Sequence, residues 1–197
     1  MVRFITIERE FGSGGRAVAE KLAEKWGVPC YGREILLKAS EKIHAPVEQL
    51  EKYEETAASS FLYTVALLGR ARTADPDMLM REGHLFVAEQ MAIRELASKG
   101  PAVFLGHCAS EALANRKGVL KVFIKADLED RKKRAAKYGI EPDQVDNEIR
   151  RFDKKRSGYY SVNTARKWHE LQNYDIVLDS SALGVEACAE SLAALVR

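Results

Sequence analysis

Short apolar runs alternate with longer amphipathic segments along most of the chain. Five runs are too short for a typical buried helix, and four of them carry β-branched residues; they are Phe4 to Ile7, Val28 to Tyr31, Ala102 to Leu105, Leu120 to Ile124 and Asp175 to Leu178. Segments with helical spacing lie between these runs. The pattern predicts an α/β fold in which helices cover both faces of a five-stranded parallel sheet, a three-layer sandwich.

The clearest predicted helix follows the first apolar run. Val18, Leu22 and Trp26 recur at four-residue spacing, and Gly27 supplies a stop at the C-terminal end. The segment from Glu8 to Gly15 joins strand and helix, so a strand, a glycine-rich turn and a helix are expected in immediate succession.

The other predicted helices fall into two regions. The first region, Gly32 to Ser98, contains helical stretches near Glu34 to Lys42, Ser60 to Arg72 and Met78 to Ser98, with breakers at Pro46 and Pro76. We interpret it as a helical insertion over one edge of the sheet. The second region follows Ile124: Asp127 is expected to cap a basic helix, a polar helix to run from Asp143 to about Arg156, and an apolar one from Val185 to Val196.

Length and charge limit the possible partners. A chain of 197 residues that is 46% hydrophobic predicts one domain, with a core at about 1–31, 100–138 and 172–197, an insertion at about 32–99 and a lid at about 139–171. A net charge of only +2 offers no global field for nucleic acid or a membrane surface. Three distant cysteines and no apolar segment of membrane length indicate a soluble cytoplasmic protein. A monomer and a homodimer both stay open.

The glycine-rich turn, Gly12 to Arg16, lies where α/β folds bind phosphate. Glycines there allow several amides to point at one anion beside a helix N-terminus. No register matches a full Walker A motif: with Gly14 as its second glycine, Gly15 replaces the lysine, and with Gly15, Arg16 replaces it. Arg16 is the candidate cation and Ser13 the remaining hydroxyl. A tight turn without a ligand is the alternative interpretation.

Several segments resemble one protein family. Ile5 to Arg16 resembles the opening of the cytidylate kinase-like family, whose members carry a similar Gly-Ser-Gly-Gly-Arg loop. Segments Asp127 to Arg134, Glu148 to Tyr160 and Asn173 to Asp179 look like the C-terminal half of the same family. The match is loose between about Glu34 and Lys99.

The resemblance implies a P-loop NTPase-type kinase fold and transfer of the γ-phosphoryl group of ATP, with Mg²⁺, to a nucleoside monophosphate such as CMP or dCMP. It implies a helical acceptor-binding insertion and a basic lid. The implied catalytic residues are Arg16, Arg151, Asp153 and Arg156. The implied phosphate-binding residues are Gly12, Ser13, Gly14, Gly15, Arg16, Arg131 and Arg134, and the acceptor-binding residues are Arg33 and His107.

Phosphoryl transfer needs positioning and cations more than covalent chemistry, which suits a basic lid that closes over the phosphates. On a helix, Asp153 would lie one turn before Arg156 and could hold it until substrate arrives. A solvated, charged helix face is the alternative for the run Arg150 to Arg156. The scattered histidines predict no metal site of their own.

Two positions depart from the family pattern and bear on the acceptor. His107 stands where relatives usually present an arginine, and Gly32 where many have an aspartate. These departures keep two alternatives open: a kinase of a non-nucleotide small molecule, and a nucleotide-binding protein without turnover.

Overall fold

The computed structural model describes residues 1–44, 47 and 76–196. The predicted helix from Ser60 to Arg72 and the break at Pro46 lie outside these residues. The strands are β1 Phe4–Arg9, β2 Cys30–Tyr31, β3 Ala102–Leu105, β4 Val119–Lys125 and β5 Ile176–Asp179. They form one parallel sheet in the order β2-β3-β1-β4-β5, so the prediction of a five-stranded parallel sheet is confirmed.

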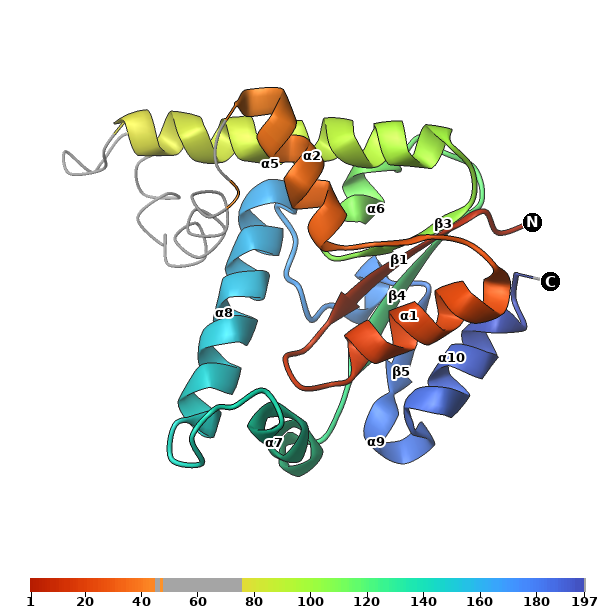
Figure 1. The fold of residues 1–197 in the computed structure, drawn as a ribbon, viewed down its shortest axis with the longest axis vertical. Helices are drawn as coiled ribbons and strands as arrows, with labels where there is room; N and C mark the ends of the chain where they lie inside the picture. Colours follow the sequence, from red (N-terminus) through yellow and green to blue (C-terminus); the bar gives the residue numbers. More distant parts are fainter. Residues whose placement is uncertain (45–46, 48–75, 197) are drawn as a thin grey trace.

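Helices cover both faces of this sheet (Figure 1). They are α1 Gly15–Trp26, α2 Arg33–Ile43, α5 Pro76–Ser98, α6 Ala109–Ala112, α7 Leu128–Ala136, α8 Val145–Thr164, α9 Ser180–Leu183 and α10 Val185–Ala193, with a 3-10 turn at Leu171–Asn173. The predicted first helix and its stop are confirmed, because Gly27 adopts a left-handed conformation after α1. The short helices α6 and α9 were not predicted.

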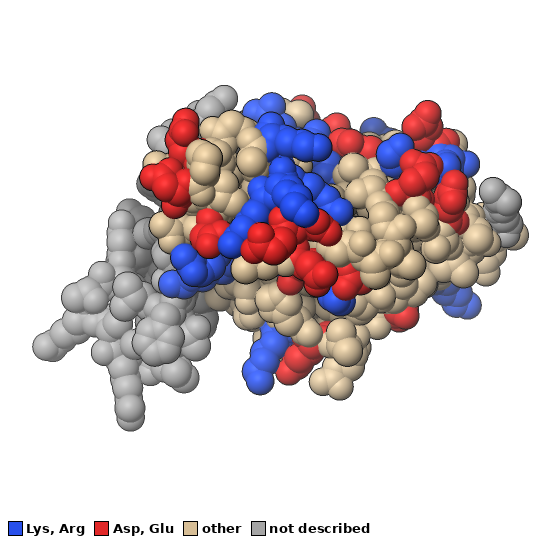
Figure 2. Space-filling model, turned by 90° about the horizontal axis from the view of Figure 1, so that it is seen from below, with Lys and Arg blue, Asp and Glu red and all other residues tan. Residues whose placement is uncertain are grey.

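Basic residues of helix α7 lie both on the protein surface and in its interior. Lys132 pairs with Asp146 at 3.0 Å and Lys133 with Asp130 at 3.2 Å, both on the surface. Figure 2, seen from below the view of Figure 1, shows Lys and Arg side chains beside Asp and Glu side chains on this face. Arg131, by contrast, is buried. Asp127 takes the N-cap position before α7, although its side chain makes no capping hydrogen bond.

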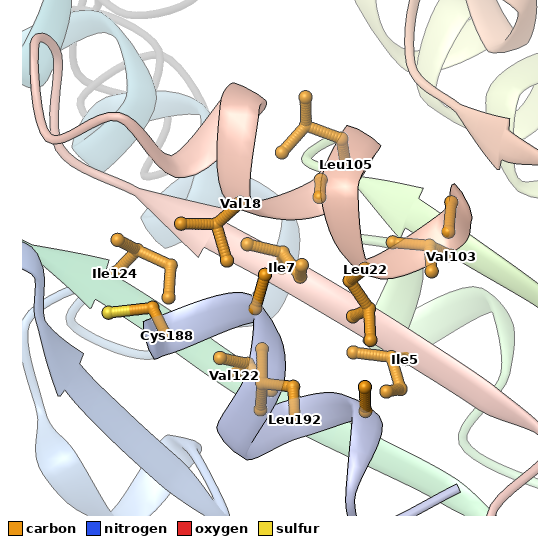
Figure 3. Packing of buried hydrophobic residues seen from close by; sticks show 14 residues of the cluster. Ile5, Ile7, Val18, Leu22, Val103, Leu105, Val122, Ile124, Cys188 and Leu192 are labelled. Carbon is orange, nitrogen blue, oxygen red and sulfur yellow. The ribbon is translucent and has the colours of Figure 1, made fainter. Parts of the chain in front are cut away.

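Residues of β1 alternate between the two layers of helices. Ile5 and Ile7 face α1 and α10, where they pack against Leu22 and Leu192 (Figure 3). Phe4 faces the opposite layer and belongs to a cluster that contains Ile93 of α5 and Phe104 of β3. This alternation is the two-residue period of a strand buried on both faces, so β1 is fixed at the centre of the core.

Helix α8 is longer than expected, since it continues to Thr164 rather than ending near Arg156. Its last turns carry Tyr160, which is only 2% exposed and belongs to an aromatic cluster with Phe123 and Trp168. The rings of Phe123 and Trp168 meet edge to face at 5.1 Å. Burial of Tyr160 in this distant cluster stabilises the extra turns, an effect that local helical spacing does not reveal.

Candidate functional site

The glycine-rich turn connects β1, at the centre of the sheet, to the N-terminus of α1. Gly12 and Gly14 have φ angles of +75° and +76°, a left-handed conformation that glycine adopts without steric cost. Gly14 is the N-cap of α1, and the first helical residue is Gly15. The turn therefore lies at a helix N-terminus and at the carboxyl end of the central strand, where α/β folds bind anions.

Side chains from α7 and from the first residue of α9 bind the carbonyl groups of this turn. Arg131 Nε donates to Phe11 O at 2.7 Å, Arg134 Nη1 to Gly12 O at 3.4 Å, and Ser180 Oγ to Ser13 O at 2.5 Å. Arg134 Nη1 also donates to Ser180 Oγ at 2.9 Å. With three consecutive carbonyls engaged by donors, the turn is fixed in one orientation.

The amides of the turn remain largely available. Within the described residues, the amides of Gly12, Gly14, Arg16 and Ala17 donate to no protein group, while those of Ser13 and Gly15 make internal hydrogen bonds of 3.3 Å. The first amides of any helix lack intrahelical acceptors and carry the positive end of its dipole. The turn can therefore bind an anion with several N–H groups at once.

Helix α8 docks directly onto the turn. Asp153 Oδ1 accepts a hydrogen bond from the Phe11 amide at 2.7 Å, and Oδ2 pairs with Arg131. The rings of Phe11 and Phe152 stack at 4.3 Å. The expected contact of Asp153 with Arg156 is thus wrong: the carboxylate bonds instead to α7 and the turn, since the docked helix brings Arg131 closer than the next turn of α8.

Arg156 also reaches the site, but through the backbone. Its Nη1 donates to Arg9 O at 2.9 Å, and its guanidinium lies 5.7 Å from the centre of the Phe11 ring. Burial, followed by the positive charge of Arg9, lowers the pKa of Arg156. The positive charge of Arg9 therefore acts on Arg156, and the carboxylates of Asp153 and Glu8 offset part of this effect.

The side chains of two expected site residues pair with surface carboxylates. Arg16 Nε pairs with Glu20 at 2.8 Å and its side chain is 78% exposed, while Arg151 pairs with Glu148 at 2.6 Å on the outer face of α8. Both pairs join residues one helical turn apart, the common arrangement of surface ion pairs. In this conformation the cation expected from Arg16 is directed away from the turn.

The two expected acceptor residues occupy different environments. Arg33 is exposed at the first position of α2, just after β2. His107 follows β3, and its Nδ1 lies 2.9 Å from Oε1 of Glu89, a carboxylate with no solvent exposure. Tyr159 of α8 donates to the other oxygen of Glu89. His107 is therefore part of a buried polar group that links α5, β3 and α8.

Sequence reasoning missed three residues of this region: Arg9, Ser180 and Glu89. Ser180 directly follows Asn173 to Asp179, the last segment that resembles the family, so the resemblance ended one residue before it. Arg9 directly precedes the turn in sequence, but spacing does not reveal the path of its side chain. Glu89 lies inside a predicted helix, and its burial depends on distant partners.

The described residues contain neither a further metal-binding cluster nor a membrane-spanning helix. Among residues 1–44, 47 and 76–196, no group of three or more His, Cys, Asp and Glu side chains could hold a metal ion. None of the described helices has the length and apolar character needed to span a membrane. The three cysteines, Cys30, Cys108 and Cys188, form no disulfide with one another in the described structure.

The sequence of this chain matches the model of a known protein family. A model of the cytidylate kinase-like family matches residues 4–182. The chain belongs to the cytidylate kinase-like family. The resemblance of the glycine-rich turn and the C-terminal segments is thereby confirmed, and family membership supports a P-loop kinase, that is, a phosphotransferase. Among curated proteins, the comparison found no match.

Several solved structures have a fold similar to that of this cytidylate kinase-like chain. An uncharacterized protein from Eubacterium ventriosum is 24% identical with a TM-score of 0.70, over 100% of this chain and 98% of that one. Shikimate kinase from Bacteroides thetaiotaomicron is 15% identical with a TM-score of 0.54, over 98% and 97% of the two chains. TT1252 from Thermus thermophilus is 20% identical with a TM-score of 0.53, over 98% and 96%. The predicted P-loop kinase fold is confirmed.

Proposed function

We propose that this protein transfers the γ-phosphoryl group of ATP to a nucleoside monophosphate, with CMP or dCMP as the acceptor. One observation carries the proposal: the turn after β1 has its carbonyls bound by Arg131, Arg134 and Ser180, and leaves amides at the start of α1 for an anion. A polyphosphate chain is the ligand that this charge pattern fits best.

The residues around the turn would have different roles in phosphoryl transfer. Backbone amides of Gly12 to Ala17 would bind the phosphate oxygens of ATP, and Arg156 would add a positive charge from α8. Asp153 would fix α8 against the turn through the Phe11 amide. With α8 docked on the turn, bound phosphates would be shielded from water, which would strengthen these electrostatic contacts and limit hydrolysis.

Magnesium would accompany the nucleotide. The Ser13 side chain is buried and its Oγ accepts a hydrogen bond from the Gly15 amide at 3.3 Å, so it does not suit a metal. Glu8 and Glu10, at the end of β1, each accept a hydrogen bond from a neutral N–H group, at 3.2 Å and 3.0 Å, and Glu10 also lies 3.6 Å from Nη1 of Arg131. Mg²⁺ prefers such carboxylates together with phosphate oxygens, so Glu8 and Glu10 would hold it. When bound, the ion neutralises charge on the transferring phosphate.

The acceptor would bind where β2 and β3 end, beside the N-terminus of α2. Both strands end at the same edge of the sheet as the turn, because all strand pairs are parallel. Exposed Arg33 would contact the acceptor phosphate, and His107 with Glu89 would shape the floor of its site. CMP and dCMP are the first choices because the chain belongs to the cytidylate kinase-like family.

The test is a coupled assay of ADP formation with purified protein, MgATP and each nucleoside and deoxynucleoside monophosphate. We expect turnover with CMP or dCMP above the other acceptors. Folded protein that forms no ADP with any nucleotide, but does so with a small hydroxylated metabolite, would contradict the proposed acceptor. Tight ATP binding without transfer to any acceptor would contradict phosphoryl transfer itself.

A further inference from the structure

The usual phosphate loop places a lysine directly after its second glycine, where it reaches the β- and γ-phosphates. Here α1 begins at Gly15 with Gly14 as its N-cap, so Gly15 is the residue that follows the last left-handed glycine. It has no side chain. Arg16, the other candidate for this role, is paired with Glu20 on the surface. The cation that faces the phosphates must therefore come from another position.

The structure also shows why position 15 is glycine. A Cβ atom on Gly15 would lie 2.5 Å from Cβ and 2.9 Å from Cγ of Arg9, closer than real side-chain atoms approach. The stem of Arg9 therefore occupies the space in which a lysine at position 15 would begin. Arg9 precedes Gly14 by five residues, the spacing of the first glycine in the usual motif. In this chain, an arginine stands at the position of the first glycine of the usual motif, and a glycine stands at the position of its lysine.

The far end of the Arg9 side chain lies beside Gly106, the first residue after β3. A Cβ atom on Gly106 would overlap Nη1 of Arg9 and lie 3.3 Å from its Cζ. Gly106 is tied to β1 through its amide, which donates to Ile7 O at 3.0 Å. The guanidinium thus extends from the turn to the end of the strand that leads into His107, between the proposed donor and acceptor sites.

We propose that Arg9 does the work of the missing lysine: its guanidinium binds the phosphoryl group as it passes from ATP to the acceptor. A planar guanidinium can bind two phosphate oxygens at once, which suits a group whose charge spreads over its oxygens during transfer. The positive charge of Arg9 also lowers the pKa of Arg156, so the two guanidinium groups are near enough to act together on one anion. This inference rests on the proposed function.

The experiment compares Arg9→Met, which keeps an apolar stem over Gly15, with Arg9→Lys and with the control Arg116→Ala. Arg116 is exposed and lies before β4, at the opposite edge of the sheet. We expect Arg9→Met to lower kcat by about 10² to 10³-fold, the usual effect of losing one transition-state donor. The affinity of Arg9→Met for ATP should fall at least tenfold, while its affinity for AMP should change less than twofold. Arg9→Lys should recover part of the kcat and part of the ATP affinity. Circular dichroism checks the fold of each variant.

A double variant tests whether a lysine at position 15 can restore the ATP binding that is lost when Arg9 is replaced. Gly15→Lys alone should lower both the melting temperature and the ATP affinity, because the new side chain collides with the Arg9 stem. Arg9→Gly with Gly15→Lys removes that collision, because alanine at position 9 would keep the Cβ that lies 2.5 Å away, and the double variant should bind ATP better than Arg9→Gly alone. A double variant no better than Arg9→Gly would contradict the exchange of places.

Binding and turnover are measured separately, so that the two proposals can fail separately. Wild-type protein that binds ATP but transfers to no acceptor would contradict the proposed function, and the Arg9 variants would still be judged by ATP affinity. Arg9→Met with wild-type ATP affinity and turnover would overturn the role of Arg9 alone.

Discussion

Replacing Asp153 tests the contact that joins α8 to the glycine-rich turn. In Asp153→Ala, the Phe11 amide loses its acceptor at 2.7 Å and Arg131 loses its ion pair. The side chains of Asp153 and Arg131 are only 17% and 9% exposed, so the range for breaking a buried pair applies, about 3–5 kcal/mol. Arg131 keeps Phe11 O at 2.7 Å and a carboxylate oxygen of Glu10 at 3.6 Å. We therefore expect the lower end, about 3 kcal/mol.

The measurement is unfolding by urea or heat, with Glu148→Ala as the control on the same helix. Glu148 pairs with Arg151, whose side chain is 49% exposed, so its loss should cost no more than about 1 kcal/mol. For a chain of this size, 3 kcal/mol corresponds to a fall of about 6 to 12 °C in melting temperature. Asp153→Asn, which can still accept from the Phe11 amide, should fall between the two. Equal losses for Asp153→Ala and Glu148→Ala would refute the reasoning.

Two other predictions follow from local crowding and from charge. Gly12→Ala should cost at least about 2 kcal/mol, because its Cβ would lie 2.6 Å from Arg131 O at a φ of +75°. Gly27→Ala, at a φ of +71° with nothing within 4 Å, should cost only about 1 kcal/mol, and equal melting temperatures would contradict this explanation. Burial, then nearby carboxylates, raises the pKa of Cys30 to about 11, so its alkylation by iodoacetamide should rise with pH throughout pH 7 to 10. Mass spectrometry of the Cys30 peptide measures this, and a rate that levels off below pH 9 would contradict it.

The sequence predicted the central part of the fold because its signals there are local. The strand before the turn is a short apolar run, and the repeat of Val18, Leu22 and Trp26 with Gly27 behind it defines α1 almost to the residue. The three glycines of the turn predicted a candidate site at the C-terminal end of β1. Local patterns of this kind need no knowledge of distant contacts.

The partners of the charged residues could not be predicted in the same way. Asp153 was expected to bind Arg156, one helical turn away, but it pairs with Arg131, and only the docking of α8 on α7 and the turn decides that choice. Arg16 looked like the phosphate cation because it follows the glycines, yet Glu20 at the next turn binds it in this conformation. Arg9 was overlooked because its role depends on where its side chain runs.

The central claim is that the amides at the start of α1 bind the polyphosphate of a nucleotide. The most direct test is a titration of ¹⁵N-labelled protein with MgATP, followed by amide chemical shifts. We predict that the amides of Gly12, Gly14, Arg16 and Ala17, which donate to no protein group in the described structure, shift together with a single dissociation constant. ATP binding that shifts other amides and leaves these four unmoved would contradict the account.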